Sequence, residues 1–180
     1  MLLESSNLKL RAIEPEDLEI LYKWENNTSL WIHGNTLSPY SKLALRQYIN
    51  DSLSMDIFQN RQLRLMACLK QDVDTVVGTV DLYDFDPQNQ RAGVGILIDE
   101  DFRGRKFASE VLQIIEYYAF NFLHLHQLYA YIATSNNISL NLFRKAGYQQ
   151  AGLLKDWLKT ADNNYCDVAF MQLIAKPKDE

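Results

Sequence analysis

Hydrophobic and polar positions follow two periods along this chain, one typical of strands and one typical of helices. Residues 8–13 alternate between apolar and polar, which predicts a strand, whereas segment 107–123 carries apolar residues at helical spacing. Further strands are predicted at 64–69, 76–84, 92–98, 127–132, 148–154 and 166–174, and further helices at about 15–25, 41–54 and 137–146. No repeat, low-complexity tract or linker interrupts this order. The sequence therefore predicts a single α+β domain over residues 1–180.

Each predicted helix should bury one side. In the first helix the side chains expected to face the core are Leu18, Leu21, Tyr22 and Trp24, and a loop at about 26–39 follows. In the long helix the expected buried stripe is Phe107, Val111, Ile115, Tyr118 and Phe122, with Glu110 and Glu116 outside it.

A short helix is predicted between Asn136 and Gly147. Asparagine is favoured where helices begin and glycine where they end. Between these two residues the apolar side chains recur at helical spacing, at Ile138, Leu142, Phe143 and Ala146. Upstream, the strand at 92–98, the turn at 103–106 and the long helix form a strand–loop–helix unit. The strand at 127–132 and this short helix form a second unit of the same kind.

Composition narrows the class of protein. The chain has 180 residues, of which 47% are hydrophobic, and a formal net charge of −5, so a basic nucleic-acid-binding domain is not indicated. Cys68 and Cys166 lie in apolar runs without metal-ligand spacing and are predicted to be buried, reduced thiols rather than a disulfide or a nucleophile. No apolar run is long enough to span a bilayer, and the first residues lack the core of a signal peptide. A cytoplasmic enzyme or binding protein is expected.

The cationic turn at 103–106 precedes the long helix. The first amides of a helix have no internal partners and carry partial positive charge, so cations and a glycine at this point favour an anion such as a pyrophosphate. The alternative is an exposed basic turn that balances the acids at 99–101. Gly93 and Gly95 favour the anion site, because glycine inside a strand often marks a close backbone approach, here to a cofactor.

The order of elements resembles the GNAT superfamily of acetyl-CoA-dependent N-acetyltransferases over nearly the full chain. The family's phosphate signature is Arg or Gln, two variable residues, Gly, one variable residue, then Gly or Ala. Arg103 and Ala108 match its ends, and Lys106 stands at the middle glycine. The segment 136–148 is similar to the second motif of the branch that contains ribosomal-protein N-terminal and spermidine acetyltransferases. The resemblance implies a mixed, mostly antiparallel central sheet of about seven strands flanked by about four helices.

By this resemblance the chain binds acetyl-CoA as a co-substrate; no metal is expected. Backbone amides on the splayed edge of strand 92–98 polarise the thioester, and an asparagine meets the pantetheine arm. The implied cofactor-binding residues are Ile96, Leu97, Ile98, Arg103, Gly104, Arg105, Lys106, Phe107, Ala108, Asn136, Ser139, Phe143 and Lys145.

Acetyl transfer to a primary amine requires a base. Such an amine, with a pKa of about 10.4, is charged at neutral pH and must lose a proton before it attacks. Relatives place a glutamate early in the fourth strand, but that position resembles Gly93 here. Asp81 or Asp84, acting through water, is therefore the predicted base, and the alternative for each is a solvated edge carboxylate.

Release of the thiolate requires an acid. Relatives commonly use a tyrosine at the position of Phe143, which has no proton to give. Ser139, one helical turn earlier, resembles the acid of part of the N-terminal-acetylating branch, and Tyr148 or an ordered water are the other candidates. The alternative role of Ser139 is to cap or line the helix.

The leading functional hypothesis is an N-acetyltransferase that works by direct attack in a ternary complex. Its predicted acceptor is a polyamine-like small molecule or a protein N-terminus, and an aminoglycoside is the alternative within the fold. The rival from another class is a non-catalytic acetyl-CoA binding or sensing module, favoured by Gly93 and Phe143 at two proton-handling positions. No nucleic-acid or membrane partner is expected, and a homodimer is one candidate assembly.

Overall fold

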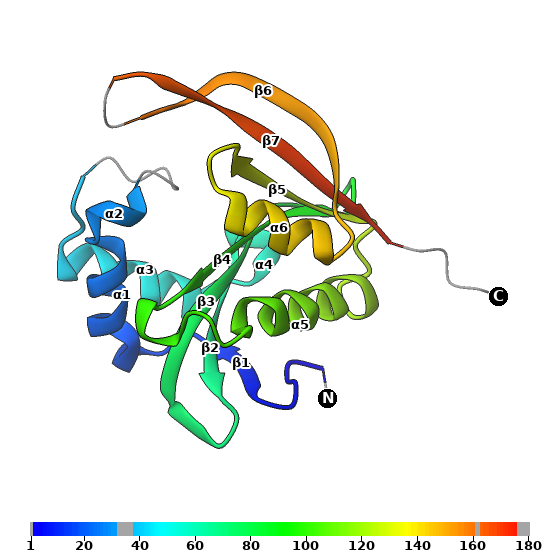
Figure 1. The fold of residues 1–180 in the computed structure, drawn as a ribbon. Coiled ribbons are helices and arrows are strands. Elements are labelled where there is room, and N and C mark those ends of the chain that lie inside the picture. Colours follow the sequence, from blue (N-terminus) through cyan, green and yellow to red (C-terminus); the bar gives the residue numbers. More distant parts are fainter. Residues whose placement is uncertain (1, 32–37, 161–162, 176–180) are drawn as a thin grey trace.

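Seven strands form one sheet in the computed structural model of the chain, which describes residues 2–31, 38–160 and 163–175 (Figure 1). The strands are β1 (Leu8–Ala12), β2 (Leu63–Leu69), β3 (Asp72–Asp86), β4 (Arg91–Ile98), β5 (Gln127–Ala133), β6 (Gln149–Lys159) and β7 (Tyr165–Ile174). The helices are α1 (Leu18–Glu25), α2 (Thr28–Trp31), α3 (Lys42–Ser54), α4 (Ile57–Asn60), α5 (Phe107–Asn121) and α6 (Asn137–Lys145), with 3₁₀ turns η1 (Pro15–Asp17) and η2 (Glu100–Phe102). The predicted α+β fold is confirmed. The described ranges hold six α-helices rather than about four, because α2 and α4 are extra single turns.

The sheet is mixed and mostly antiparallel, as predicted. Its strand order is β1-β2-β3-β4-β5-β7-β6, and β4 and β5 are its parallel neighbours. The predicted closing hairpin is confirmed by the antiparallel pairing of β6 with β7. The segment 71–74, predicted to turn, instead belongs mostly to β3, because the connection from β2 uses only Lys70 and Gln71.

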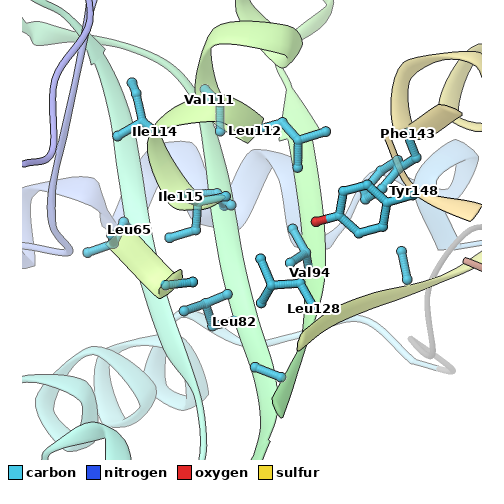
Figure 2. Packing of buried hydrophobic residues seen from close by; sticks show 14 of the residues in the cluster. Leu65, Leu82, Val94, Val111, Leu112, Ile114, Ile115, Leu128, Phe143 and Tyr148 are labelled. Carbon is cyan, nitrogen blue, oxygen red and sulfur yellow. The ribbon is translucent and has the colours of Figure 1, made fainter. Parts of the chain in front are cut away.

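Two apolar cores lie on opposite faces of the sheet. Consecutive residues of β2 alternate between them: Leu65 and Ala67 pack with α5 and α6, whereas Met66 and Cys68 pack with α1 and α3. We call these the α5–α6 face and the α1–α3 face; in Figure 1, α5 and α6 cross in front of the sheet and α3 lies behind it. Figure 2 shows the first core, which includes Val111, Leu112, Ile115, Leu82, Val94 and Leu128.

Two residues predicted to be buried are exposed: Tyr22 is 38% exposed and Phe122 56%. Ile138, one of the apolar residues at helical spacing in 136–147, is 86% exposed. Phe122 follows the last residue of α5, and α6 buries Leu140 and Phe143, which turns Ile138 to solvent. Of the predicted loop at 26–39, residues 28–31 form α2, and residues 32–37 lie outside the described ranges.

The parallel strands β4 and β5 separate after three residue pairs. Their register is Arg91↔Gln127, Ala92↔Leu128 and Gly93↔Tyr129, although β4 continues to Ile98. Over its length β5 stays paired with β7, and β4 stays paired with β3. Within the described residues, the backbone of 94–98 therefore pairs on one side only. We call this opening in the sheet the split, and it confirms the splayed edge predicted for this strand.

Both cysteines are free thiols; Cys68 is buried, as predicted, whereas Cys166 is half-buried. None of the helices in the described parts of the chain has the length and apolar character needed to cross a membrane. Across residues 2–31, 38–160 and 163–175, no three His, Cys, Asp or Glu side chains gather as metal ligands.

Candidate active site

The turn between η2 and α5 presents a row of free backbone amides. Gly104 and Lys106 have left-handed φ values of 78° and 65°, and α5 begins at Phe107 without a side-chain cap. The amides of residues 104–108 donate no hydrogen bond within the described structure, and the next amide, of Ser109, donates to the carbonyl of Lys106 at 3.0 Å. Free amides in a left-handed turn at a helix N-terminus form a concavity for an anion. We call residues 103–108 the cradle.

Lys106 holds a backbone conformation that glycine adopts more easily. A left-handed φ costs an L-residue roughly 1–2 kcal/mol, whereas glycine has no Cβ to clash. The phosphate signature has glycine at this position, and the observed φ of 65° explains that requirement. In exchange for this strain, lysine adds a positive charge beside the free amides.

The cationic side chains of the cradle keep their charges free. Arg103, Arg105 and Lys106 are exposed, and none of them pairs with a carboxylate in the described structure. The guanidinium of Arg105 lies 5.4 Å from the ring of Phe102, and Arg103 Nε donates to the carbonyl of Ile98 at 3.3 Å. In the described structure these cations therefore form no ion pair with the acids at 99–101, which the alternative interpretation invokes.

Asp99 instead anchors the start of this turn to α1. Its Oδ2 accepts hydrogen bonds from Lys23 Nζ at 2.9 Å and Trp24 Nε1 at 2.7 Å. Burial acts to raise the pKa of Asp99, but the hydrogen bonds from Lys23 and Trp24 outweigh it and lower the pKa. The carboxylate is thus held ionised inside the protein, and it fixes where the cradle begins.

The helix α6 begins and ends as the sequence predicts. Asn136 is its N-cap, with Oδ1 accepting from the amide of Ser139 at 3.1 Å. Gly147 has φ 97°, and the amides of Gly147 and Tyr148 donate to the carbonyls of Arg144 and Phe143, both at 3.0 Å. This pair of bonds is the Schellman motif, in which a glycine occupies the left-handed position because it has no Cβ to clash.

Asn136 and Ser139 are the polar groups that α6 presents near its N-terminus. Both are half-buried, and within the described residues neither Nδ2 of Asn136 nor the hydroxyl of Ser139 has a hydrogen-bond partner. Lys145 lies at the other end of the helix, about 13 Å away along the axis, and is exposed. Phe143 is 4% exposed and packs against the ring of Tyr148, with centroids 4.8 Å apart.

Tyr148 lies in the core and not at an open surface. It is 3% exposed, and its hydroxyl and Oε1 of Glu116 are buried without a hydrogen-bond partner in the described residues. Figure 2 shows this hydroxyl pointing toward α5 and β4. Burial raises the pKa of Glu116 to about 7 and raises that of Tyr148 as well. Glu116, predicted outside the buried stripe, therefore faces inward, and Ser139 is the better exposed of the two candidate hydroxyls.

Asp81 lies on the α1–α3 face within an ion-pair network. Its Oδ1 accepts from Arg64 Nε at 2.7 Å and from Gln62 Nε2 at 3.1 Å, and Arg64 also bonds Glu25 Oε1 at 2.7 Å. Arg64 and Glu25 were missed from sequence. The available signal was an arginine at the edge of an apolar strand, because such a charge needs carboxylate partners once buried.

Asp84 is exposed at a bulge of β3. The register of β3 with β4 shifts between Tyr83 and Asp86, and Asp84 has a left-handed φ of 49°. Strict alternation along β3 would place Asp84 on the opposite face from Tyr83. The bulge breaks the alternation, and the negative charge of Asp84 adds to burial in raising the pKa of Tyr129 to about 12.

The ring of Tyr83 leaves no room for a side chain at Gly93. A Cβ at Gly93 would lie 2.3 Å from the ring of Tyr83, whereas a Cβ at Gly95 would meet nothing closer than 3.8 Å. The prediction that these glycines admit a cofactor is therefore wrong for Gly93, where the close approach is that of Tyr83. Gly95 faces Asp81 across the β3–β4 pair and leaves space there.

Comparison with known proteins decides the family. A family model described as an acetyltransferase (GNAT) domain matches residues 7–149. This chain belongs to the GNAT acetyltransferases. An uncharacterized N-acetyltransferase, p20 of Bacillus licheniformis, is 29% identical over 97% of this chain and 96% of its own. Spermidine N(1)-acetyltransferase of Vibrio cholerae is 24% identical over 94% of each chain.

A solved structure agrees with this assignment. The crystal structure of spermidine N-acetyltransferase from Vibrio cholerae in complex with CoA and spermine is similar to this GNAT chain with a TM-score of 0.83, at 26% identity over 94% of this chain and 96% of that one. The predicted recognition, enzyme class and acyl donor are confirmed: the chain is an N-acetyltransferase, and acetyl-CoA is its co-substrate.

The acetyltransferase has features that fit acetyl-CoA. The cradle offers five free amides and three unpaired cations for a diphosphate, and the split exposes strand backbone around the half-buried Ile96, Leu97 and Ile98. Phe107 and Ala108 are half-buried, and they are the first two residues of α5 and the last two of the cradle. Cradle and α6 lie on the α5–α6 face, while the carboxylates Asp81 and Glu25 lie on the other.

Proposed function

We propose that this acetyltransferase acetylates a primary amine of a small, polyamine-like cationic molecule. The observation that carries the proposal is the split, which opens the sheet between the cradle on one face and a group of carboxylates on the other. A thioester held from the α5–α6 face and an amine arriving from the α1–α3 face would meet there, and such positioning supplies much of the rate. The relatives named spermidine acetyltransferases support the acceptor class.

The residues that would hold acetyl-CoA follow from the geometry above. The amides of 104–108, with Arg103, Arg105 and Lys106, would bind the diphosphate. Nδ2 of Asn136 is the free donor for an amide of the pantetheine arm. The unpaired edge of β4 near Ile96 and Ile98 would donate to the thioester oxygen, where negative charge develops during attack. Bound there, acetyl-CoA supplies the acyl group.

The base that takes the proton of the amine, relayed by a water, is assigned to one of two carboxylates. Asp81 is rigidly held by Arg64 and lies beside Gly95, level with the split. Asp84 is exposed, and both its oxygens are free within the described structure. Ser139 is the proposed donor to the departing thiolate, because Tyr148 is buried and Phe143 has no hydroxyl.

The acceptor is tested by free-thiol release from acetyl-CoA with spermidine, a peptide with a free N-terminus and an aminoglycoside. The expected result is the highest kcat/KM for spermidine. A preference for the peptide or the aminoglycoside would overturn the proposed acceptor. Saturable binding of acetyl-CoA without thiol release on any amine would instead support the sensing module.

Matched variants distinguish which of the two carboxylates acts as the base. Asp81→Asn and Asp84→Asn are assayed for kcat against pH, with thermal unfolding as the control for loss of the Arg64 network. The variant that lacks the base should lose most of its kcat and the alkaline rise of its pH profile. Unchanged profiles in both variants would remove both residues from proton transfer.

A further inference from the structure

Four aromatic rings gather on the α1–α3 face beside the split. Tyr83 comes from β3, Tyr129 and Tyr131 from β5, and Phe170 from β7. The centroid of Tyr129 lies 6.0 Å from that of Tyr83 and 5.6 Å from those of Tyr131 and Phe170, and Tyr131 lies 5.2 Å from Phe170. We call these four residues the aromatic wall.

The wall is only partly covered by the rest of the protein. Tyr129 is 9% exposed and forms its base, whereas Tyr131 is 47% exposed and Phe170 is half-buried. Rings that only fill a core would be buried together. Here the inner ring supports an outer ring that the protein leaves open to solvent.

The wall stands beside the reaction centre proposed above. The last β4–β5 pair joins Gly93 to Tyr129, so Tyr131, two residues on, is level with Gly95 across the split. Ile96, whose strand edge would face the thioester, is the next residue of β4. A molecule that reacts in the split therefore extends past Tyr131 if it approaches from this face.

The charged side chains described near the aromatic wall are either acidic or are cations already paired with a carboxylate. Asp84 is close enough to contribute to the raised pKa of both Tyr83 and Tyr129. The nearby cation Arg91 is paired with Asp86 at 3.2 Å, and Arg64 is shared between Asp81 and Glu25. A cationic group would meet no unpaired positive side chain among these neighbours.

We infer that Tyr131 and Phe170, supported by Tyr129 and Tyr83, form a cation–π site for the second ammonium group of a diamine or polyamine acceptor. Ring faces attract an ammonium ion within about 6 Å of their centroids, and this attraction strengthens when water is partly excluded. Asp84 adds a negative charge beside the supporting rings of Tyr83 and Tyr129. The inference rests on the proposed function and adds a determinant of acceptor choice: an alkylamine with a distal positive charge is preferred over one with a neutral tail.

The test compares two acceptors of equal chain length, 1,4-diaminobutane and butylamine. Kinetic constants for both are measured on the wild-type enzyme, Tyr131→Leu and Tyr131→Phe. Tyr117→Leu is the matched control, because Tyr117 is 56% exposed but lies on α5. The wild type should favour the diamine. Tyr131→Leu should reduce that preference about five- to tenfold through a higher KM for the diamine, whereas Tyr131→Phe and Tyr117→Leu should keep it.

Two kinetic outcomes would overturn the inference. Equal losses for both acceptors in Tyr131→Leu would mean a simple apolar contact, and a loss in Tyr131→Phe as large as in Tyr131→Leu would mean a hydrogen bond from the hydroxyl. Calorimetry of 1,4-diaminobutane on the protein saturated with CoA separates this inference from the proposed function. Binding that weakens in Tyr131→Leu supports the aromatic site even if no turnover occurs, whereas binding no tighter than that of butylamine in the wild type refutes it.

Discussion

The two helices beside the split begin in opposite ways. At α5, the N-cap Lys106 has a left-handed backbone and no capping side chain, so the amides of 104–108 stay free. At α6, Asn136 closes the first turn by accepting from the amide of Ser139. Both segments follow a strand and a turn, and both were predicted from sequence to be parts of one cofactor site.

This difference indicates different ligand chemistry at the two helices. An uncapped N-terminus surrounded by free cations suits a multiply charged anion. A capped N-terminus has fewer amides to offer, so its contribution to binding shifts to the side chains, here the carboxamide of Asn136 and the hydroxyl of Ser139. These features support the proposal that the diphosphate binds at α5 and the neutral pantetheine arm at α6.

The largest expected effect is at the uncapped helix. Replacing Arg103, Arg105 and Lys106 together by glutamine should weaken CoA binding about 100-fold, because three charge-assisted contacts to phosphate are lost. Calorimetry at low and high salt measures the change, and the wild-type affinity should fall toward that of the variant as salt rises. The matched control replaces the exposed cations Lys9, Arg46 and Lys159. A similar loss in that control would mean that only overall charge matters.

The second prediction separates the two roles of Asn136. Asn136→Ala removes both the cap and the amide donor, so the free energy of unfolding should fall by about 1 kcal/mol and CoA affinity should fall several-fold. Asn136→Asp keeps an acceptor for the amide of Ser139 but has no donor. It should retain stability and still lose affinity. Wild-type affinity in Asn136→Asp would reduce Asn136 to a cap.

A smaller effect is expected at Glu116 of α5, beside Tyr148. The pKa of Glu116 is raised by burial to about 7, above its ordinary value of 4.5, so the folded protein binds the proton more tightly than the unfolded chain. Stability from this group is therefore present below pH 4.5 and is lost as pH rises through about 7. Glu116→Gln should raise the melting temperature at pH 8 and leave it nearly unchanged at pH 4.5. Equal shifts at both pH values would exclude this ionisation as the cause.

The smallest effect is expected for Lys106→Gly, which keeps the turn but removes its strain and one charge. Relief of about 1–2 kcal/mol of left-handed strain is partly offset by the roughly 0.5–1 kcal/mol of entropy that glycine loses on folding. A net stabilisation of at most about 1 kcal/mol is expected in chemical denaturation, together with slightly weaker CoA binding. Lys106→Ala, which keeps the strain, is the control and should not be stabilised.

Sequence reasoning succeeded where the relevant physics is local. The N-cap at Asn136, the stop at Gly147 and the sharp turn at Gly104 depend on residues only a few positions apart, and each has the predicted conformation. The left-handed Lys106 was less expected. The signature showed that glycine was missing there, but only the observed φ showed that lysine adopts the same turn.

Prediction from sequence failed where residues that are distant in the chain come into contact. Tyr83 covers Gly93 from the neighbouring strand, and Arg64 holds Asp81 from another. Tyr148, a candidate acid, is enclosed beside Glu116 of α5. Periodicity assigns a side chain to a face of its own element, but it does not say which distant side chain lies opposite.

By itself, the sequence determined the order of strands and helices, the capping of α6, the cationic turn and the membership of an acetyltransferase family. The tertiary structure decided that the cations of the turn are unpaired, that β4 and β5 part after Gly93, and that aromatic rings from three strands line one face of the opening. Helix caps and alternation depend on neighbours along the chain, whereas ion pairs, burial and strand separation depend on contacts that exist only after the sheet has assembled.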